Sequence, residues 1–214
     1  MSIDTSKMSK EKAAALEIAE AGRDELHKSL AGGLFTGDAD FSSIYPYPEQ
    51  SAESQKIGDE FIKQLEEVFD KYINSDWIDT QGEIPDQVFK ELAKIGAFSI
   101  KIPKKYKGKG FSQLNYAKAA IFTGSKDGNI AALLSAHQSI GVPQPLLMYG
   151  TEKQKKKYLP KFAKGAVSAF ALTETDAGSD PAQMKTTAEP TKDGKHFIIK
   201  GEKLWSTNGI KADV

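Results

Sequence analysis

The chain contains no cysteine among its 214 residues. That absence excludes disulfide bonds, thiol catalysis and cysteine-ligated metal sites. Histidine is also scarce, with three in the whole sequence. His27 and His196 have no carboxylate or second histidine at metal-ligand spacing, so we expect no metal site. His137 falls in a segment typical of a buried helix, where a histidine is more often a hydrogen-bonded core residue than a ligand.

The sequence also lacks an excess of charge of either sign. Lys+Arg and Asp+Glu both total 29, which gives no electrostatic basis for binding nucleic acid or an anionic membrane. No apolar run approaches the length of a transmembrane helix. The first residues lack the apolar core of a secretory signal. A mitochondrial transit peptide is rich in arginine, but no arginine precedes Arg23. We therefore expect a cytoplasmic protein without a transmembrane segment.

Helical patterns occupy most of the chain. Residues 10–30 are rich in helix-forming side chains, and residues 34–48 have the composition of an extended linker. From Ile57 to Tyr72, apolar side chains recur every three or four positions, which predicts a helix of roughly five turns. Further helices are expected after Pro85 and over residues 112–122, 130–140 and 151–163, with breaks at 76–85 and 124–128.

The pattern changes after Gly165. Residues 166–173, 183–189, 196–200 and 203–207 are predicted as strands, and Asp193-Gly194 as a hairpin turn. We therefore expect an α+β fold, with an all-helical domain followed by the start of an antiparallel β domain. The expected divisions are residues 1–45 (helical extension and linker), 46–165 (helical domain) and 166–214 (beginning of the β domain).

Two motifs lie in this last part. Residues 170–180 read Phe-Ala-Leu-Thr-Glu-Thr-Asp-Ala-Gly-Ser-Asp, an apolar start that runs into a polar turn of small residues. In such a turn Gly178 permits a close backbone approach, and successive N–H groups suit an anion such as a phosphate. The second motif is Trp205-Ser206-Thr207-Asn208-Gly209, in which an indole face precedes two hydroxyls and an amide.

These motifs resemble those of the acyl-CoA dehydrogenase family. The first family signature is matched by Ala171-Leu172-Thr173-Glu174 and Ala177-Gly178-Ser179-Asp180, and departs from it at Thr175 and Gln183. The second is matched by Gly201, Lys203, Trp205, Thr207, Asn208 and Gly209. The resemblance covers the chain from about Phe35 onward. Residues 45–48, 92–98, 135–141 and 150–160 are most similar to the long-chain and very-long-chain branch.

The resemblance implies an FAD-dependent oxidoreductase that removes two hydrogens from a fatty acyl-CoA in β-oxidation, with electrons passing to an electron-transfer flavoprotein. Phe170, Ala171, Leu172 and Thr173 would line the flavin ring, with Thr173 at its polar edge. Gly178 and Ser179 would hold the diphosphate side, and Ser179 would also touch the substrate. Trp205 would lie beside the ring, Ser206 would contribute backbone contacts, and Thr207 would bond near the reactive nitrogen.

The resemblance also implies a longer protein with a C-terminal helical domain, which commonly forms a homodimer or homotetramer. The chain is thus expected to be an incomplete part of the enzyme that binds FAD poorly and has no turnover. No catalytic residue is named, because the family's base lies beyond Val214; Glu174 is expected to be structural. A eukaryotic member would be located in the mitochondrial matrix.

Several alternatives stay open at this point. Taken singly, residues 173–180 could be only a polar turn and Trp205 only a core aromatic. The small residues Ala131, Ala132, Ser135 and Ala136 could leave room for an acyl chain or serve close helix packing. The lysines between Lys153 and Lys164 could form a solvated helix face or contact CoA phosphates. The chain could also belong to an acyl-CoA oxidase, a nitroalkane-oxidase-like relative or a non-catalytic helical interaction module.

Overall fold

A computed structural model describes residue 13, residues 30–47 and residues 49–214. They belong to two compact units, which divide between Gln50 and Ser51. In the first unit α2 spans Leu30–Thr36 and a 3-10 turn spans Phe41–Ser43. The helix expected over residues 10–30 lies almost wholly outside the described residues. Gly33 lies inside α2, where a Cβ would collide with the backbone of Asp38 and Ala39.

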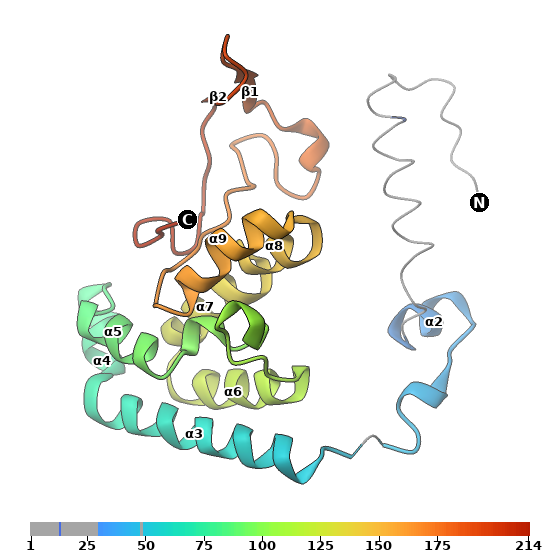
Figure 1. The fold of residues 1–214 in the computed structure, drawn as a ribbon, viewed down its shortest axis with the longest axis vertical. Helices are drawn as coiled ribbons and strands as arrows, with labels where there is room; N and C mark the ends of the chain where they lie inside the picture. Colours follow the sequence, from blue (N-terminus) through green and yellow to red (C-terminus); the bar gives the residue numbers. More distant parts are fainter. Residues whose placement is uncertain (1–12, 14–29, 48) are drawn as a thin grey trace. The chain divides into compact units, whose positions relative to one another are not determined.

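The second unit is built mainly from helices, which Figure 1 shows stacked above the long α3. Each of the longer helices begins at a side-chain cap: Ser51 for α3, Ser112 for α6 and Thr151 for α9. These caps satisfy amide groups that a helix leaves free at its first turn. The helices are α3 (Ala52–Tyr72), α4 (Ser75–Gln81), α5 (Asp86–Lys94), α6 (Gln113–Lys126), α7 (Gly128–Ser135), α8 (Pro143–Tyr149) and α9 (Glu152–Phe162).

The main core forms where α3, α5, α6 and α7 meet. The stripe predicted on α3 is confirmed in its centre, because Phe61, Leu65 and Val68 are buried. A smaller apolar cluster contains Leu159 and Phe162 of α9. The lysines of α9 are mostly exposed, as expected for a solvated face.

The structure places helix in part of each expected break. Residues 76–85 contain most of α4, which Asn74 caps and Gly82 ends in a left-handed conformation. The break expected at residues 124–128 is confirmed but is confined to Asp127, because α6 continues through Gly124 to Lys126 and α7 begins at Gly128. Asp127 caps α7 by accepting a hydrogen bond from the amide of Ile130.

α7 continues directly into a π-helical turn, Ala136–Ile140. In this turn two consecutive polar side chains, His137 and Gln138, are both buried. Each one bonds a carbonyl of the 3-10 turn Ala97–Ser99. Local π-helical turns are frequent at functional sites.

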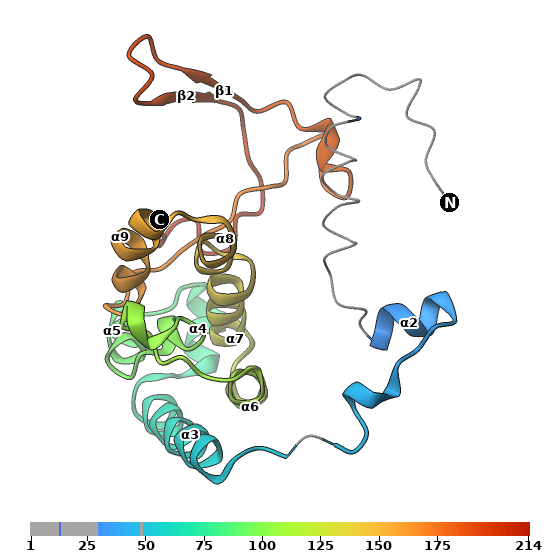
Figure 2. The ribbon, with the colours of Figure 1, turned by 45° about the vertical axis from the view of Figure 1, so that its right-hand side comes forward.

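The β part is smaller than predicted. β1 (Thr187–Pro190) and β2 (Phe197–Lys200) pair antiparallel, with Thr187 opposite Lys200, around the expected Asp193-Gly194 turn. Figures 1 and 2 show this hairpin projecting away from the helices. Residues 166–173 and 203–207 are not strands. Trp205 has φ 56°, which is incompatible with a strand, and residues 166–173 bond other segments only at isolated points.

The expected α+β fold, with a helical domain before antiparallel strands, is confirmed. Within the described part of the chain, no helix combines the length and apolar character needed to cross a membrane.

Candidate functional site

The two sequence motifs meet at one hollow of about 320 Å³, which we call the Trp205 hollow. It lies where the segment around Phe170 passes the segment around Trp205, beside the π-helical turn. Its lining residues are Ala136, Ile140, Phe170, Leu172, Thr173, Leu204, Trp205 and Thr207. Five of the nine predicted site residues thus line one cavity.

Two aromatic side chains in the lining of this hollow are exposed. The Trp205 side chain is 87% exposed and Phe170 is 45% exposed. The interpretation of Trp205 as a core aromatic is therefore wrong. Two exposed aromatic rings around a hollow are typical of a surface that a flat apolar ligand or a partner covers.

Backbone and side-chain bonds fix the spacing of the two segments. The amide of Leu204 donates to the carbonyl of Thr173 at 2.8 Å. The Lys203 ammonium donates to the carbonyl of Leu172 at 2.9 Å and to Glu174 Oε1 at 2.7 Å. These bonds place Thr173 and Trp205 on adjacent segments.

Glu174 is a fully engaged carboxylate. In addition to Lys203, its Oε2 accepts from the amide of Lys185 at 2.7 Å and its Oε1 from the amide of Thr186 at 3.1 Å. Lys203 above all, with these amides, lowers the pKa of Glu174 to about 2. A carboxylate so held is a poor proton acceptor, which agrees with the structural role expected for it.

The other predicted site residues lie outside the lining of the Trp205 hollow. Gly178 and Ser179 are exposed on the turn that follows Glu174, Ala171 is exposed and Ser206 is half-buried. A Cβ on Gly178 would meet nothing closer than Thr173 Cγ2 at 4.0 Å, so the chain's own packing does not require glycine there. The departure at Gln183 causes no packing conflict, because its side chain is exposed and donates to Asp180.

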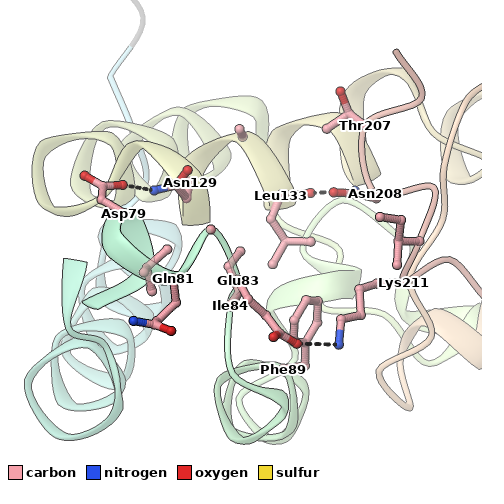
Figure 3. A pocket seen from close by; sticks show the side chains of 14 residues that line it. Asp79, Gln81, Glu83, Ile84, Phe89, Asn129, Leu133, Thr207, Asn208 and Lys211 are labelled. Atoms are coloured by element: carbon pink, nitrogen blue, oxygen red, sulfur yellow. Dashed lines mark hydrogen bonds and ion pairs between the residues drawn. The ribbon is translucent and has the colours of Figure 1, made fainter. Parts of the chain in front are cut away.

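A second hollow, of about 610 Å³, adjoins the first and is shown in Figure 3; we call it the Lys211 hollow. Thr207 lines both hollows. On one helix face, Ala132 and Leu133 line the Lys211 hollow, and Ala136 lines the Trp205 hollow. The remaining lining residues are Ile78, Asp79, Gln81, Gly82, Glu83, Ile84, Phe89, Asn129, Asn208, Ile210 and Lys211.

The small residues of α7 therefore divide into two groups. Ala132 and Ala136 face the open hollows. Ala131 and Ser135 instead border a cavity of about 20 Å³ against α3 and α6. Helix packing thus accounts for Ala131 and Ser135, and the open space lies beside Ala132 and Ala136.

Sequence reasoning missed the function of Asn208. Its amide donates to the carbonyl of Leu133 at 3.1 Å, visible in Figure 3, and to the carbonyl of Ser168 at 3.3 Å. Asn208 has φ 67°, a left-handed conformation that asparagine tolerates better than most residues. The sequence signal that could have indicated Asn208 is its position in the second motif.

His137 is a packed core residue, as expected, and it is completely buried. Burial lowers its pKa from 6.5 to about 4, against a hydrogen bond to the Phe98 carbonyl that raises it. Among the described residues, no group of three His, Asp or Glu side chains is arranged as metal ligands.

Replacement of His137 by glutamine is expected to weaken the loss of stability in acid. The unfolded chain takes up the histidine proton at a higher pH than the folded chain, so folding loses roughly 3 kcal/mol between about pH 6.5 and pH 4. Urea unfolding across this range should show a steeper decline for the wild type than for His137→Gln. Parallel declines would contradict the assignment.

Comparison with known proteins agrees with this geometry. Residues 51–166 match the family described as "Acyl-CoA dehydrogenase, N-terminal domain", and residues 169–214 match "Acyl-CoA dehydrogenase, middle domain". The helices and the β hairpin of the second unit thus match two successive domains of one dehydrogenase family. The chain belongs to the acyl-CoA dehydrogenase family.

Individual relatives support the family over nearly the whole chain. The "Probable acyl-CoA dehydrogenase FadE10" of Mycobacterium tuberculosis is 42% identical over 203 residues, covering 95% of this chain and 31% of that protein. The human "Very long-chain specific acyl-CoA dehydrogenase, mitochondrial" is 37% identical over 196 residues, covering 87% of this chain and 29% of that protein. The chain therefore spans about a third of the length of these relatives.

A solved structure gives the same fold. The acyl-CoA dehydrogenase from Bacillus anthracis, in complex with FAD, superposes with a TM-score of 0.68 at 33% identity. The match covers 78% of this chain and 28% of the Bacillus chain.

Proposed function

We propose that the complete gene product is an FAD-dependent acyl-CoA dehydrogenase of fatty-acid β-oxidation, and that this chain supplies part of its flavin site. The observation that carries the proposal is the Trp205 hollow, where residues of both motifs line one cavity with two exposed aromatic rings. The division into residues 1–45, 46–165 and 166–214 stays a prediction within this proposal.

The residues present fit a flavin. The exposed Trp205 and Phe170 side chains offer apolar surface to a planar ring, and Thr173 and Thr207 bring hydroxyls to the same cavity. The open space at Gly178 suits the close approach of a ligand. Among the described residues, no acceptor takes a hydrogen bond from the amides of Gly178 or Ser179, so both are available to an anion.

Each predicted site residue then has a role. Phe170, Leu172 and Trp205 would cover the ring, while Thr173 and Thr207 would hydrogen-bond its polar edge. Gly178 and Ser179 would hold the diphosphate, with Ser179 also near the substrate. Ala171 and Ser206 would contribute backbone contacts. Bound FAD would supply the redox chemistry by accepting a hydride from the β-carbon of the acyl-CoA.

The acyl chain of the substrate would lie along α7. The two hollows adjoin at Thr207, and Ala132 and Ala136 lie one turn apart on the face that lines them. Their small side chains leave room that a bulkier residue would fill. This placement favours medium to long fatty acyl chains as the substrate class.

The chain's own part in the reaction is to bind and orient. Within the described part of the chain no carboxylate lines the Trp205 hollow, and Glu174 is committed to Lys203 and two amides. The base is therefore not assigned to a residue of this chain. Transfer of electrons to an electron-transfer flavoprotein, assembly as a homodimer or homotetramer, and a cytoplasmic or mitochondrial-matrix location belong to the same proposal.

The test uses the complete gene product and the two tryptophans of the present chain, Trp77 and Trp205. The purified protein should carry a flavin spectrum, and acyl-CoA added without oxygen should bleach it. Trp205→Ala should weaken FAD binding by about tenfold, the loss of one aromatic contact. Trp77→Ala is the matched control and should not, because Trp77 is 44% exposed on α4 and lines neither the Trp205 hollow nor the Lys211 hollow.

A wild-type protein that binds no FAD and oxidises no acyl-CoA would contradict the proposal. Stoichiometric hydrogen peroxide with oxygen as acceptor would instead identify an acyl-CoA oxidase. Equal FAD affinities for the two tryptophan variants would remove Trp205 from the site.

A further inference from the structure

His137 connects the π-helical turn to two other parts of the fold. Its Nε2 lies 2.7 Å from the carbonyl of Phe98, which can only accept, so Nε2 carries the proton. Its Nδ1 therefore accepts, and it takes a hydrogen bond of 3.0 Å from the amide of Ser168. The Ser168 hydroxyl lies 2.9 Å from the same nitrogen. His137 is thus a neutral imidazole with one defined tautomer.

The ring of His137 has little freedom to move. Phe98 packs edge-on against it at a centroid distance of 5.4 Å, and Phe162 does so at 5.2 Å. The close approach of the π-helical turn to Ser168 depends on Gly141. A Cβ on Gly141 would collide with Ser168 Oγ and the His137 carbonyl.

Ser168 is a further point, besides the Lys203 and Leu204 bonds, where the two halves of the candidate flavin site are joined. It is completely buried and lies two residues before Phe170. Its amide and hydroxyl face His137, while its carbonyl accepts from the Asn208 amide at 3.3 Å. Asn208 directly follows Thr207 and also donates to the Leu133 carbonyl. A continuous chain of bonds therefore runs from His137 through Ser168 to Asn208.

We infer that His137 is a positioning residue for the flavin site: through Ser168 and Asn208 it fixes the Phe170–Thr173 segment and the Trp205–Thr207 segment against the π-helical turn. The inference rests on the proposed function. His137 touches neither ligand hollow, so it acts only through the residues that it holds. Neither motif contains it or Ser168.

The neighbouring Gln138 provides a matched control. It is 2% exposed in the same π-helical turn, and its side chain donates to the carbonyl of Ala97, next to the Phe98 carbonyl that His137 bonds. Gln138 makes no bond to Ser168 among the described residues. His137→Phe and Gln138→Leu therefore each remove buried hydrogen bonds to the same 3-10 turn, but only the first cuts the connection to Ser168.

Two measurements on the complete gene product separate positioning from general stability. The first is hydrogen–deuterium exchange of the flavin-free protein, in which His137→Phe should speed exchange over residues 166–173 and 203–209. The second is FAD affinity, which should fall about tenfold for His137→Phe and less than about threefold for Gln138→Leu. His137→Gln, which keeps one donor and one acceptor, should recover most of the affinity.

If His137→Phe fails to fold, Asn208→Gly tests the other end of the chain of bonds, since glycine keeps the left-handed backbone without the amide. It should raise exchange over residues 166–173 and weaken FAD binding. A wild-type protein without FAD affinity would overturn the proposed function and the inference with it. A wild-type protein that binds FAD, with His137→Phe or Asn208→Gly no different from Gln138→Leu, would overturn the inference alone.

Discussion

Replacement of Ala132 by phenylalanine is expected to shorten the longest acyl chain that the complete gene product oxidises. Ala132 is exposed on the face of α7 that lines the Lys211 hollow, so a phenyl ring would occupy space now open. A ring that displaces three methylenes removes their burial, at about 0.8 kcal/mol each. The ratio kcat/KM for the longest substrates should fall roughly fifty-fold.

The measurement is kcat/KM for a series of saturated acyl-CoA substrates of increasing length. Short substrates serve as an internal control, because their chains would end before Ala132 and their rates should be unchanged. Ser135→Phe is the matched variant, since Ser135 lies one turn further along but borders the small cavity against α3 and α6. A uniform loss across all chain lengths would place the acyl chain elsewhere.

The sequence predicts the longer helices well because their burial is one-sided. On α3 the apolar positions repeat over many turns, and Phe61 and Leu65 at its centre are buried. α4 was missed because only Ile78 of its seven residues is buried, which leaves no periodicity to detect. Its boundary residues, Asn74 and Gly82, were the remaining signal.

The predicted strands failed where local composition does not decide the outcome. A strand needs a continuous ladder of partners. The backbone bonds from residues 166–173 to later segments are isolated, one to Leu204 and the others to Asp213-Val214. The left-handed backbone of Trp205 also ends any regular strand, and an isolated tryptophan gives no sign of such a conformation.

The part of the candidate site that consists of motif residues could be predicted from the sequence. Thr173, Trp205 and Thr207 are motif positions, and the fold brings them to one hollow. Lys203 and Glu174 are also motif positions of opposite charge, so their ion pair could have been proposed. The connection from His137 to Ser168 could not, because it depends on how the π-helical turn approaches a distant segment.

Replacement of Lys203 by methionine is expected to disrupt the flavin site from within. Methionine keeps much of the side-chain length but removes the ammonium that bridges Glu174 and the carbonyl of Leu172. Glu174 would retain two amide donors without a counter-charge, and of the bonds between the two motif segments only the backbone bond from Leu204 to Thr173 would remain. We expect FAD affinity to fall by about tenfold or more and the melting temperature to drop.

Lys185→Met is the matched control, because Lys185 pairs with Asp176 on the surface, where both side chains are largely exposed. Exposed ion pairs contribute little, so this variant should retain FAD affinity and thermal stability.

Acid titration adds an independent readout. In the wild type, the stability from Glu174 is complete above its ordinary pKa of 4.5 and is lost as the pH falls toward about 2. Without Lys203 the folded-state pKa of Glu174 should rise toward its ordinary value, so this contribution shrinks and the stability of Lys203→Met should depend less on pH in that window. If Lys203→Met and Lys185→Met were alike in FAD affinity and acid response, the Glu174–Lys203 pair would have no part in holding the two motifs together.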